Sequence, residues 1–321
     1  MKAMVYERYG PPEALELREV DKPVPEADAV LVRVHAASVN PLDWHFLTGT
    51  PYLTRFMLGL RAPKEQRLGV DFAGTVEAVG RDVDHVEPGD EVFGGRHGAF
   101  AEYVAAKDAV VRKPVGVSFE DAAATPIAGV TALQGLRDKG AVQAGQKVLV
   151  NGASGGVGTF AVQLARIFGA EVTAVCSQHN VETARLLGAD RVIDYTKEDF
   201  TRSGVRYDLL LDIVGNHSWT ECRRVLVDGG RYVMVGGPKT NRLIGPLGMA
   251  ARRQLVSTIG SRRAIKFLAK LNRDDLGYLA GLIADGSVKP VIDRRYGLAE
   301  TPEAVGYVGA GHARGKVVIA V

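Results

Sequence analysis

The chain has 321 residues, enough for two domains of ordinary size, each with its own hydrophobic core. Hydrophobic residues make up 46% and charged residues 24%, a balance that is typical of a globular protein and excludes a disordered one. The 40 basic and 37 acidic side chains leave a formal net charge of +3, too small an excess to predict a nucleic-acid or membrane partner.

The two cysteines, Cys176 and Cys222, are too few for a disulfide scaffold or a four-cysteine zinc site. The first residues show neither the apolar stretch of a signal peptide nor the pattern of a transit peptide. No run of about 18 apolar residues occurs, so we expect a cytoplasmic protein that does not cross a membrane.

The first third of the sequence predicts short strands separated by turns. Segments rich in β-branched residues occur at 29–34, 74–79 and 91–93, each next to Gly, Pro or Asp. Between the last two, Pro88 and Gly89 allow an antiparallel chain to reverse. Because no long helical period is evident before about residue 118, we expect a compact β-barrel or sandwich here.

From Ser118 onward the pattern changes to alternating strands and helices. Ser118 with Asp121 three positions on is typical of a helix start, and we expect a helix at 122–134. Further helices are expected at 159–168, 181–187 and 274–284, and strands at 147–150, 171–175, 191–193, 208–214 and 230–235. Short apolar strands separated by helices predict a parallel sheet covered on both faces. We expect a last strand, at 316–321, to return to the N-terminal domain.

A glycine-rich turn follows the strand expected at 147–150 and opens the next helix. Residues 153–158 read A-S-G-G-V-G, a dinucleotide-binding pattern with alanine in the first glycine place. Gly155 lets the backbone approach a pyrophosphate, and Gly158 lets helix and strand pack closely. Since the helix N-terminus offers unpaired N–H groups, we predict that the cofactor binds at Ala153, Ser154, Gly155, Gly156 and Val157.

The end of the next strand indicates which nicotinamide cofactor is bound. Enzymes that prefer NAD(H) usually carry Asp or Glu there, but residues 175–180 hold no carboxylate. Ser177, His179 and Asn180 can instead donate hydrogen bonds to a 2′-phosphate, which favours NADP(H). The alternative is an ordinary polar loop at a strand end.

Six segments in order along the chain carry a family resemblance: 36–44 (AASVNPLDW), 69–76 (GVDFAGTV), 88–94 (PGDEVFG), 98–103 (GAFAEY), 153–158 and 311–318 (GHARGKVV). The chain resembles the zinc-free branch of the medium-chain dehydrogenase/reductase superfamily, the quinone oxidoreductase-like and enone reductase-like proteins. The resemblance implies an α/β protein with a GroES-like β-barrel catalytic domain at 1–121 and 272–321. It also implies a Rossmann doubly wound parallel-sheet domain at 122–271 that binds NADP(H), an active site between the two domains, and a homodimer.

Zinc-dependent relatives place a Cys ligand within the segment that is 39–41 here, and a His-Glu pair where this chain has Val70 and Asp71. Neither ligand type stands at those positions, so no metal is expected. Without a Lewis acid, the accessible reaction is hydride transfer to an already activated acceptor, a quinone or an α,β-unsaturated carbonyl.

The resemblance also implies individual roles. Asn40 stands beside nicotinamide and substrate, where its amide can donate to a developing enolate oxygen. Asp43 and Tyr52 are candidate proton relays, and Trp44 and Phe56 candidate walls of a substrate pocket; purely structural roles are the alternative. Further cofactor positions are Thr131, Tyr195, Val214, Gly215, Gly236, Gly237, Arg314, Gly315 and Lys316.

The segment 229–273 carries no acidic residue but many basic ones. It is either a solvated basic face or a flap whose apolar residues Leu243, Ile244, Leu247 and Met249 cover a substrate. Two other functions stay open: a non-catalytic, redox-sensing NADPH-binding protein, and a zinc alcohol dehydrogenase.

Overall fold

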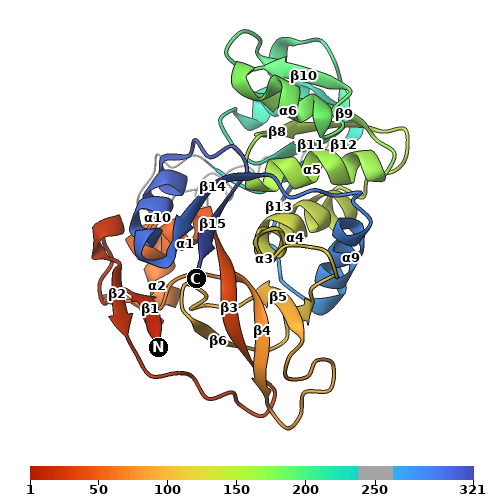
Figure 1. Ribbon diagram of the computed structural model, residues 1–321. Coiled ribbons are helices and arrows are strands. Elements are labelled where there is room, and N and C mark those ends of the chain that lie inside the picture. The colour runs from red at the N-terminus through yellow and green to blue at the C-terminus, as the bar shows by residue number, and fades with distance from the viewer. Residues whose placement is uncertain (238–262) are drawn as a thin grey trace. The chain divides into compact units, whose positions relative to one another are not determined.

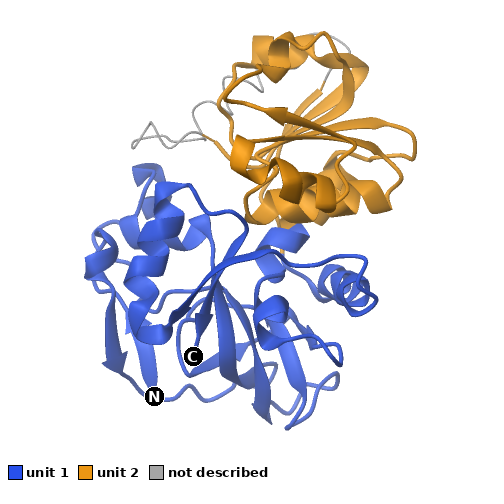
Figure 2. Ribbon diagram, turned by 45° about the horizontal axis from the view of Figure 1, so that its top comes forward, with its two compact units in different colours: residues 1–130, 271–321 blue, residues 131–270 orange. Residues whose placement is uncertain are grey.

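The computed structural model describes residues 1–237 and 263–321, and its sheets and helices confirm the predicted α/β fold class (Figure 1). The chain divides into two compact units (Figure 2). Unit 1 comprises residues 1–130 and 271–321, and unit 2 comprises residues 131–270. The boundaries expected from the sequence lay at 121/122 and 271/272. No helix in the described part of the chain is long and apolar enough to cross a bilayer.

Unit 1 is organised around one mixed sheet in the order β14-β15-β3-β4-β5-β7, with β6 also paired to β3. These strands are β14 (Ile292–Gly297), β15 (Lys316–Ala320), β3 (Val30–Val39), β4 (Asp71–Val79), β5 (Glu91–Gly95), β7 (Val110–Arg112) and β6 (Tyr103–Ala106). A separate hairpin pairs β1 (Lys2–Val5) with β2 (Glu16–Glu19). The expected return of the last strand is confirmed, because β15 pairs antiparallel with β3.

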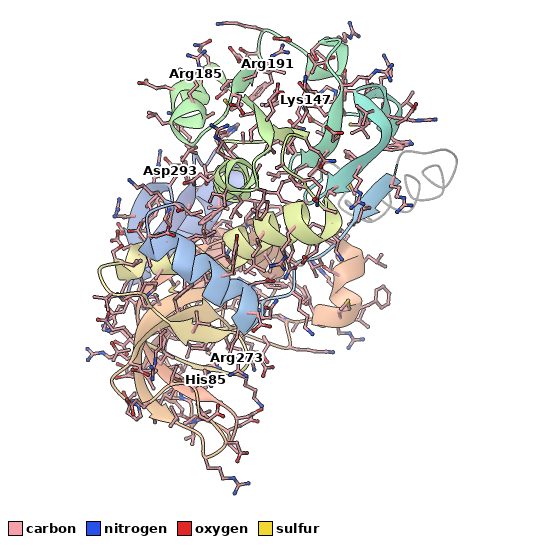
Figure 3. All side chains as sticks on the ribbon, turned by 90° about the vertical axis from the view of Figure 1, so that its right-hand side faces the viewer. His85, Lys147, Arg185, Arg191, Arg273 and Asp293 are labelled. Carbon is pink, nitrogen blue, oxygen red and sulfur yellow. The ribbon has the colours of Figure 1, made fainter. Side chains whose placement is uncertain are left out.

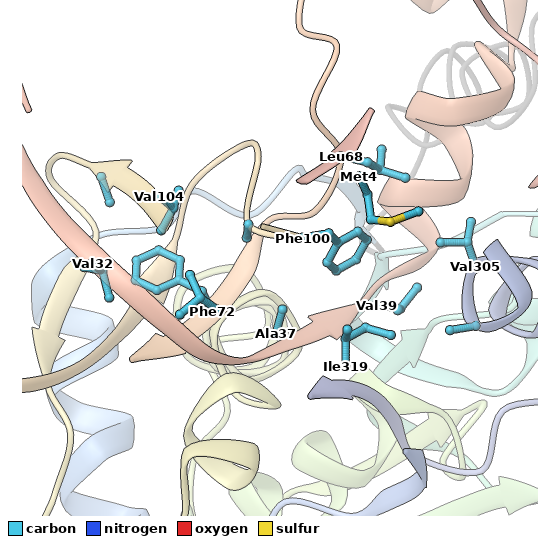
Figure 4. Close-up of a cluster of buried hydrophobic side chains, with 14 of the residues drawn as sticks. Met4, Val32, Ala37, Val39, Leu68, Phe72, Phe100, Val104, Val305 and Ile319 are labelled. Carbon is cyan, nitrogen blue, oxygen red and sulfur yellow. The ribbon is translucent and has the colours of Figure 1, made fainter. Parts of the chain in front are cut away.

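The core of unit 1 forms where the apolar residues of these strands converge. It includes Met4, Val32, Leu68, Phe72, Phe100 and Ile319, which are all at most 1% exposed (Figure 4). The 3-10 helices of this unit are η1 (Pro12–Ala14), η2 (Tyr52–Thr54) and η6 (Leu298–Glu300). Its α-helices are α1 (Pro41–Thr48), α2 (Arg55–Leu58), α3 (Phe119–Ala123), α9 (Arg273–Ala284) and α10 (Thr301–Ala310), and α4 (Pro126–Gln134) begins in it.

The helices of this unit differ from the sequence-based expectation at three places. Helix α1 lies in the stretch where no long helical period was expected, and it has only 8 residues. Its start is set by Asn40, whose backbone N–H donates to Asp43 at 2.7 Å. Helix α10 was not among the expected helices, and Gly311 ends it with a φ of 86°. The single helix expected at 122–134 is two helices, because Pro126 opens α4 and lacks the N–H needed to continue α3.

Unit 2 is a parallel sheet in the order β10-β9-β8-β11-β12-β13. The strands are β10 (Arg191–Asp194), β9 (Glu171–Cys176), β8 (Lys147–Asn151), β11 (Tyr207–Asp212), β12 (Leu226–Met234) and β13 (Arg263–Lys266). The order reverses direction between β8 and β11, which is the doubly wound Rossmann arrangement. Val148, Leu149 and Val150 are wholly buried, as expected for a parallel strand with both faces covered.

The helices of unit 2 are α5 (Gly156–Ile167), α6 (Val181–Leu186) and α7 (Trp219–Arg224). Shorter turns are η4 (Gln178–Asn180), η5 (Phe200–Arg202) and the π-helical η3 (Gly135–Lys139). The strand expected at 208–214 ends two residues earlier, at Asp212, whose side chain holds the following loop.

Candidate active site

The glycine-rich turn lies between β8 and α5, at the point where the strand order of unit 2 reverses. A Cβ on Gly158 would stand 2.1 Å from the Gly152 carbonyl oxygen, so only glycine lets α5 pack against this turn. A Cβ on Gly155, the residue that caps α5, would meet only the Gly152 oxygen at 3.8 Å. Space is therefore open beside Gly155 at the N-terminus of α5, where a pyrophosphate fits.

The loop after β9 brings two of the three predicted phosphate-binding residues together. The Asn180 side-chain amide donates to the Ser177 hydroxyl at 3.0 Å, while His179 is exposed. Sequence reasoning missed a cation here: Lys197 donates from Nζ to the side-chain oxygen of Gln178 at 2.5 Å. It comes from the turn after β10, so only the pairing of β10 with β9 reveals its position.

Sequence reasoning also missed a carboxylate in this part of unit 2. Asp194 ends β10 opposite Cys176, and 11% of its side chain is exposed. Its charge is offset by Lys197, whose Nζ lies 3.6 Å from Asp194 Oδ2. The predicted cofactor residue Tyr195 follows it, donates from its backbone N–H to the Cys176 carbonyl at 3.1 Å, and is 60% exposed.

A fully buried carboxylate, Asp212, organises the loop after β11, and it was not among the predicted site residues. Its Oδ1 accepts hydrogen bonds from the Gly215 N–H at 2.8 Å and from the Asn151 amide at 2.8 Å, while its Oδ2 accepts from the Tyr232 hydroxyl at 2.6 Å. The ends of β8, β11 and β12 are thereby joined. An acidic residue ending an apolar strand, at the edge where ligands bind in such sheets, was the available signal.

The other predicted cofactor residues of unit 2 lie at the following positions. Val214 is 41% exposed in the loop that Asp212 holds. Gly236 directly adjoins that loop, because a Cβ there would stand 2.0 Å from the Ile213 oxygen. Thr131, on α4, is 8% exposed, and Gly237 follows Gly236. Leu243, Ile244, Leu247 and Met249, the residues of the suggested flap, lie outside the described residues.

In unit 1 the structure brings Asn40 and Lys316 together around Asp71. All three side chains are at most 2% exposed. Asp71 Oδ2 accepts from the Asn40 amide at 2.8 Å, from the Ser38 hydroxyl at 2.9 Å and from Lys316 Nζ at 3.2 Å. Its Oδ1 accepts from the Ile127 N–H at 3.0 Å. We call Ser38, Asn40, Asp71 and Lys316 the buried polar cluster.

Asp43, a predicted proton relay, lies beside this cluster and is fully buried. Its Oδ2 accepts the Asn40 backbone N–H, but its Oδ1 has no hydrogen-bond partner among the described residues. Burial raises the pKa of the Asp43 carboxyl to about 7, against the opposing effect of the Asn40 N–H. The Asp71 carboxylate raises this pKa further, and the Lys316 ammonium lowers it.

The remaining predicted residues of unit 1 are not gathered at the buried polar cluster. Tyr52 and Phe56 are 41% and 70% exposed. Trp44 packs against the hydrophobic core, next to Gly309. Arg314 is exposed, and its backbone N–H donates at 2.8 Å to Asp293 of β14, which Figure 3 labels. Gly315 has a φ of 125° and sits too close to the Val291 oxygen for a side chain.

The side chains at the positions where zinc-dependent relatives carry their zinc ligands do not fit zinc. Asn40 presents a neutral amide, Val70 presents no donor, and Asp71 already faces the ammonium of Lys316. A divalent ion on Asp71 would stand next to a buried cation. Among residues 1–237 and 263–321, no three His, Cys, Asp or Glu side chains form a group that could hold a metal.

Comparisons with known proteins match both units. Residues 26–115 match the model described as an alcohol dehydrogenase GroES-like domain, and residues 187–319 match the model described as a zinc-binding dehydrogenase. The chain is 35% identical to the NAD(P)H oxidoreductase RTN4IP1, mitochondrial, of Mus musculus, over 100% of this chain and 89% of that protein. It is also 35% identical to the 2-methylene-furan-3-one reductase of Solanum lycopersicum, over 99% of this chain and 79% of that protein.

Among solved structures, the quinone oxidoreductase from Coxiella burnetii is similar over 100% of this chain and 99% of that one. The TM-score is 0.88 and the sequence identity 34%. The part of this chain that is similar in fold therefore includes the segments that carry the glycine-rich turn and the buried polar cluster.

Proposed function

We infer the activity of this chain from its family, because the chain belongs to the quinone oxidoreductase-like medium-chain dehydrogenase/reductases. It is an NAD(P)H-dependent oxidoreductase. We propose that it reduces quinones or α,β-unsaturated carbonyls, that it does so without a metal, and that it prefers NADPH. The observation that carries the proposal is the glycine-rich turn at the switch point of the Rossmann sheet, where the N-terminus of α5 borders open space.

The preference for NADPH is supported by the loop after β9. Ser177 and Asn180 are close enough to act together on one phosphate, and each carries a hydrogen-bond donor. Lys197 supplies the nearby positive charge, through its contact with Gln178. Because it also offsets Asp194, the repulsion between that carboxylate and a 2′-phosphate is reduced.

Bound NADPH would supply the hydride from its nicotinamide ring. The work of the chain is then to bind, orient and stabilise charge. The glycine-rich turn and α5 hold the pyrophosphate, and the loop organised by Asp212 is a further wall of the cofactor site. As charge develops on the acceptor oxygen, we assign Asn40 the role of hydrogen-bond donor. Asp43 and Tyr52 remain candidate proton relays.

The test is NADPH oxidation by purified enzyme, followed by the loss of NADPH absorbance, with 9,10-phenanthrenequinone, 1,4-naphthoquinone and a set of enones and enals. Activity that survives prolonged treatment with a metal chelator is the expected result. Binding of NADPH without turnover of any acceptor would refute the proposal in favour of a non-catalytic NADPH-binding protein. Activity that the chelator abolishes and zinc restores would refute metal independence.

We also propose a homodimer joined along an edge of the Rossmann sheet. Among the described strands, β10 and β13 form the two edges, and edge strands leave backbone groups that a second copy can pair. A particle of twice the subunit mass in light scattering after gel filtration is the expected result, and a monomer at micromolar concentration would contradict it.

A further inference from the structure

The register of three neighbouring strands places the buried polar cluster at one end of those strands in the unit 1 sheet. Strand β3 ends at Val39, β4 begins at Asp71, and β15 begins at Lys316. Ser38 pairs with Asp71, and Val317 pairs with Val39, so Lys316 lies opposite Asn40. Two charged residues and one amide therefore meet where a sheet this apolar would otherwise hold hydrocarbon side chains.

Within this cluster the Asn40 amide is held from both ends. Lys316 Nζ donates to Asn40 Oδ1 at 2.7 Å, and Asn40 Nδ2 donates to Asp71 Oδ2 at 2.8 Å. Turning the amide by half a rotation would set its N–H groups against an ammonium and its oxygen against a carboxylate. Both contacts would become repulsive in a region with little solvent to screen them. The ammonium and the carboxylate thus permit one orientation of the amide.

This orientation leaves one amide hydrogen weakly engaged. The second contact of Asn40 Nδ2 is to the Ser38 carbonyl at 3.4 Å, which is longer than the range of about 2.7–3.2 Å for a good N–H···O hydrogen bond. That hydrogen is the one that Asn40 can offer to a ligand. The ammonium on Oδ1 withdraws electron density from the amide and strengthens this donor.

We propose that Lys316 is a positioning residue: its buried ammonium, together with Asp71, fixes the Asn40 amide so that one hydrogen stays available to the oxygen of the substrate. This inference rests on the proposed function, and it gives Lys316 a different role from the cofactor contact that the family resemblance implies. The geometry favours positioning, since Lys316 is 2% exposed and its ammonium contacts Asn40 and Asp71 within unit 1.

The test compares Lys316→Met and Lys316→Gln with wild type in quinone reduction and in NADPH binding by fluorescence titration. Lys316→Met is expected to lower kcat about tenfold to a hundredfold, while the Kd for NADPH changes less than about threefold. Lys316→Gln keeps a donor for Asn40 Oδ1 and is expected to recover part of that loss. If Lys316→Met does not fold, Lys316→Gln is compared with wild type instead, and it should show a lower kcat with a nearly unchanged Kd for NADPH.

A double variant shows whether Lys316 acts through Asn40. Combined with Asn40→Ala, Lys316→Met is expected to lower kcat by no more than about threefold beyond Asn40→Ala alone. Two losses that multiply would overturn the proposal, as would a raised Kd for NADPH with kcat unchanged. Lys113→Met is the matched control, because only 5% of the Lys113 side chain is exposed and it forms an ion pair with Glu91 on the same unit without contacting Asn40. Its kcat should equal that of wild type.

Failure of the proposed function has a different signature. Wild-type enzyme that binds NADPH but reduces no acceptor would overturn both conclusions. Wild-type enzyme that turns over, with a Lys316→Met variant that loses only affinity for NADPH, would overturn the positioning role alone.

Discussion

Replacing Asp43 by Asn should remove a pH dependence from the stability of unit 1. Asp43 is wholly buried, and burial raises the pKa of its carboxyl from 3.8 to about 7. A carboxyl that binds its proton more tightly in the folded than in the unfolded chain stabilises the fold fully below about pH 4. That contribution is lost as the pH rises through 7, so wild-type stability should fall across this window.

The size of the effect follows from the difference between the two pKa values. The interval from 3.8 to about 7 corresponds to about 4 kcal/mol, at about 1.4 kcal/mol for each pH unit. In the variant, the amide oxygen can still accept the Asn40 N–H, and the amide nitrogen takes the place of Oδ1, which has no partner among the described residues. Because the amide does not titrate, the stability of the variant relative to wild type should rise by up to about 4 kcal/mol as the pH increases.

The assay is thermal unfolding of wild type and Asp43→Asn from pH 4.5 to 8.5. About 3 kcal/mol of the contribution is lost between these two pH values, so the Tm of the variant relative to wild type should rise by about 6 °C or more, at about 2–4 °C for each kcal/mol. Asp21→Asn, at an exposed aspartate, is the control and should show a difference that is independent of pH. A stability of Asp43→Asn relative to wild type that stays constant or falls as the pH rises would refute the assignment of a neutral buried carboxyl.

Three further predictions concern unit 2. Gly158→Ala should abolish NADPH binding and lower Tm, because its Cβ would stand 2.1 Å from the Gly152 oxygen. The control is Gly277→Ala on α9, whose Cβ would meet nothing within 4 Å and which should bind NADPH as wild type does; equal binding by the two variants would contradict the prediction. Wild type should bind NADPH about tenfold to a hundredfold more tightly than NADH, as measured by titration. Ser177→Asp should invert that order, because its carboxylate would repel the 2′-phosphate; tighter binding of NADH by wild type would refute the prediction. Asp212→Asn should destabilise the chain by about 2 kcal/mol in urea unfolding and weaken NADPH binding, because a fully buried acceptor of four hydrogen bonds loses its charge. An unchanged affinity for NADPH would show that the loop after β11 does not depend on the Asp212 carboxylate.

The sequence was sufficient for the Rossmann sheet because each strand of that sheet is a short apolar run bounded by recognisable turns. Residues 147–150 and 171–175 were predicted as strands, and β8 and β9 occupy them almost residue for residue. The glycine-rich turn was equally accessible, since the restriction at Gly158 acts through its contact with a turn only a few residues away.

Helix α1 was missed for a different reason. Its residues 41–48 mix aromatic and polar side chains without a clear apolar face, so periodicity gave no signal. The start signature was present in Asn40, Pro41 and Asp43, and it would have identified the helix. Local capping chemistry, rather than hydrophobic spacing, determines a helix this short.

The contacts of the candidate site that the sequence could not give are those made across strands. Lys197 reaches Gln178 only through the pairing of β10 with β9, and Lys316 reaches Asn40 only through the pairing of β15 with β3. Sequence separation hides both contacts. The resemblance located the position of Lys316, and the structure adds the contacts of its side chain with Asn40 and Asp71.

The insertion of β15 beside β3 has a consequence for how the chain is made. Lys316 is synthesised 276 positions after Asn40, which at about 5–20 residues per second takes roughly 15–55 seconds of translation. Residues 131–270 form one uninterrupted stretch and can fold during that time. The side of β3 that pairs with β15 in the folded chain stays unpaired until β15 has been synthesised. Asp71 meanwhile lacks its ammonium partner. A nascent chain in this state presents an open strand edge to other nascent chains, so the rate of ribosome release should govern how much of the protein reaches its native state.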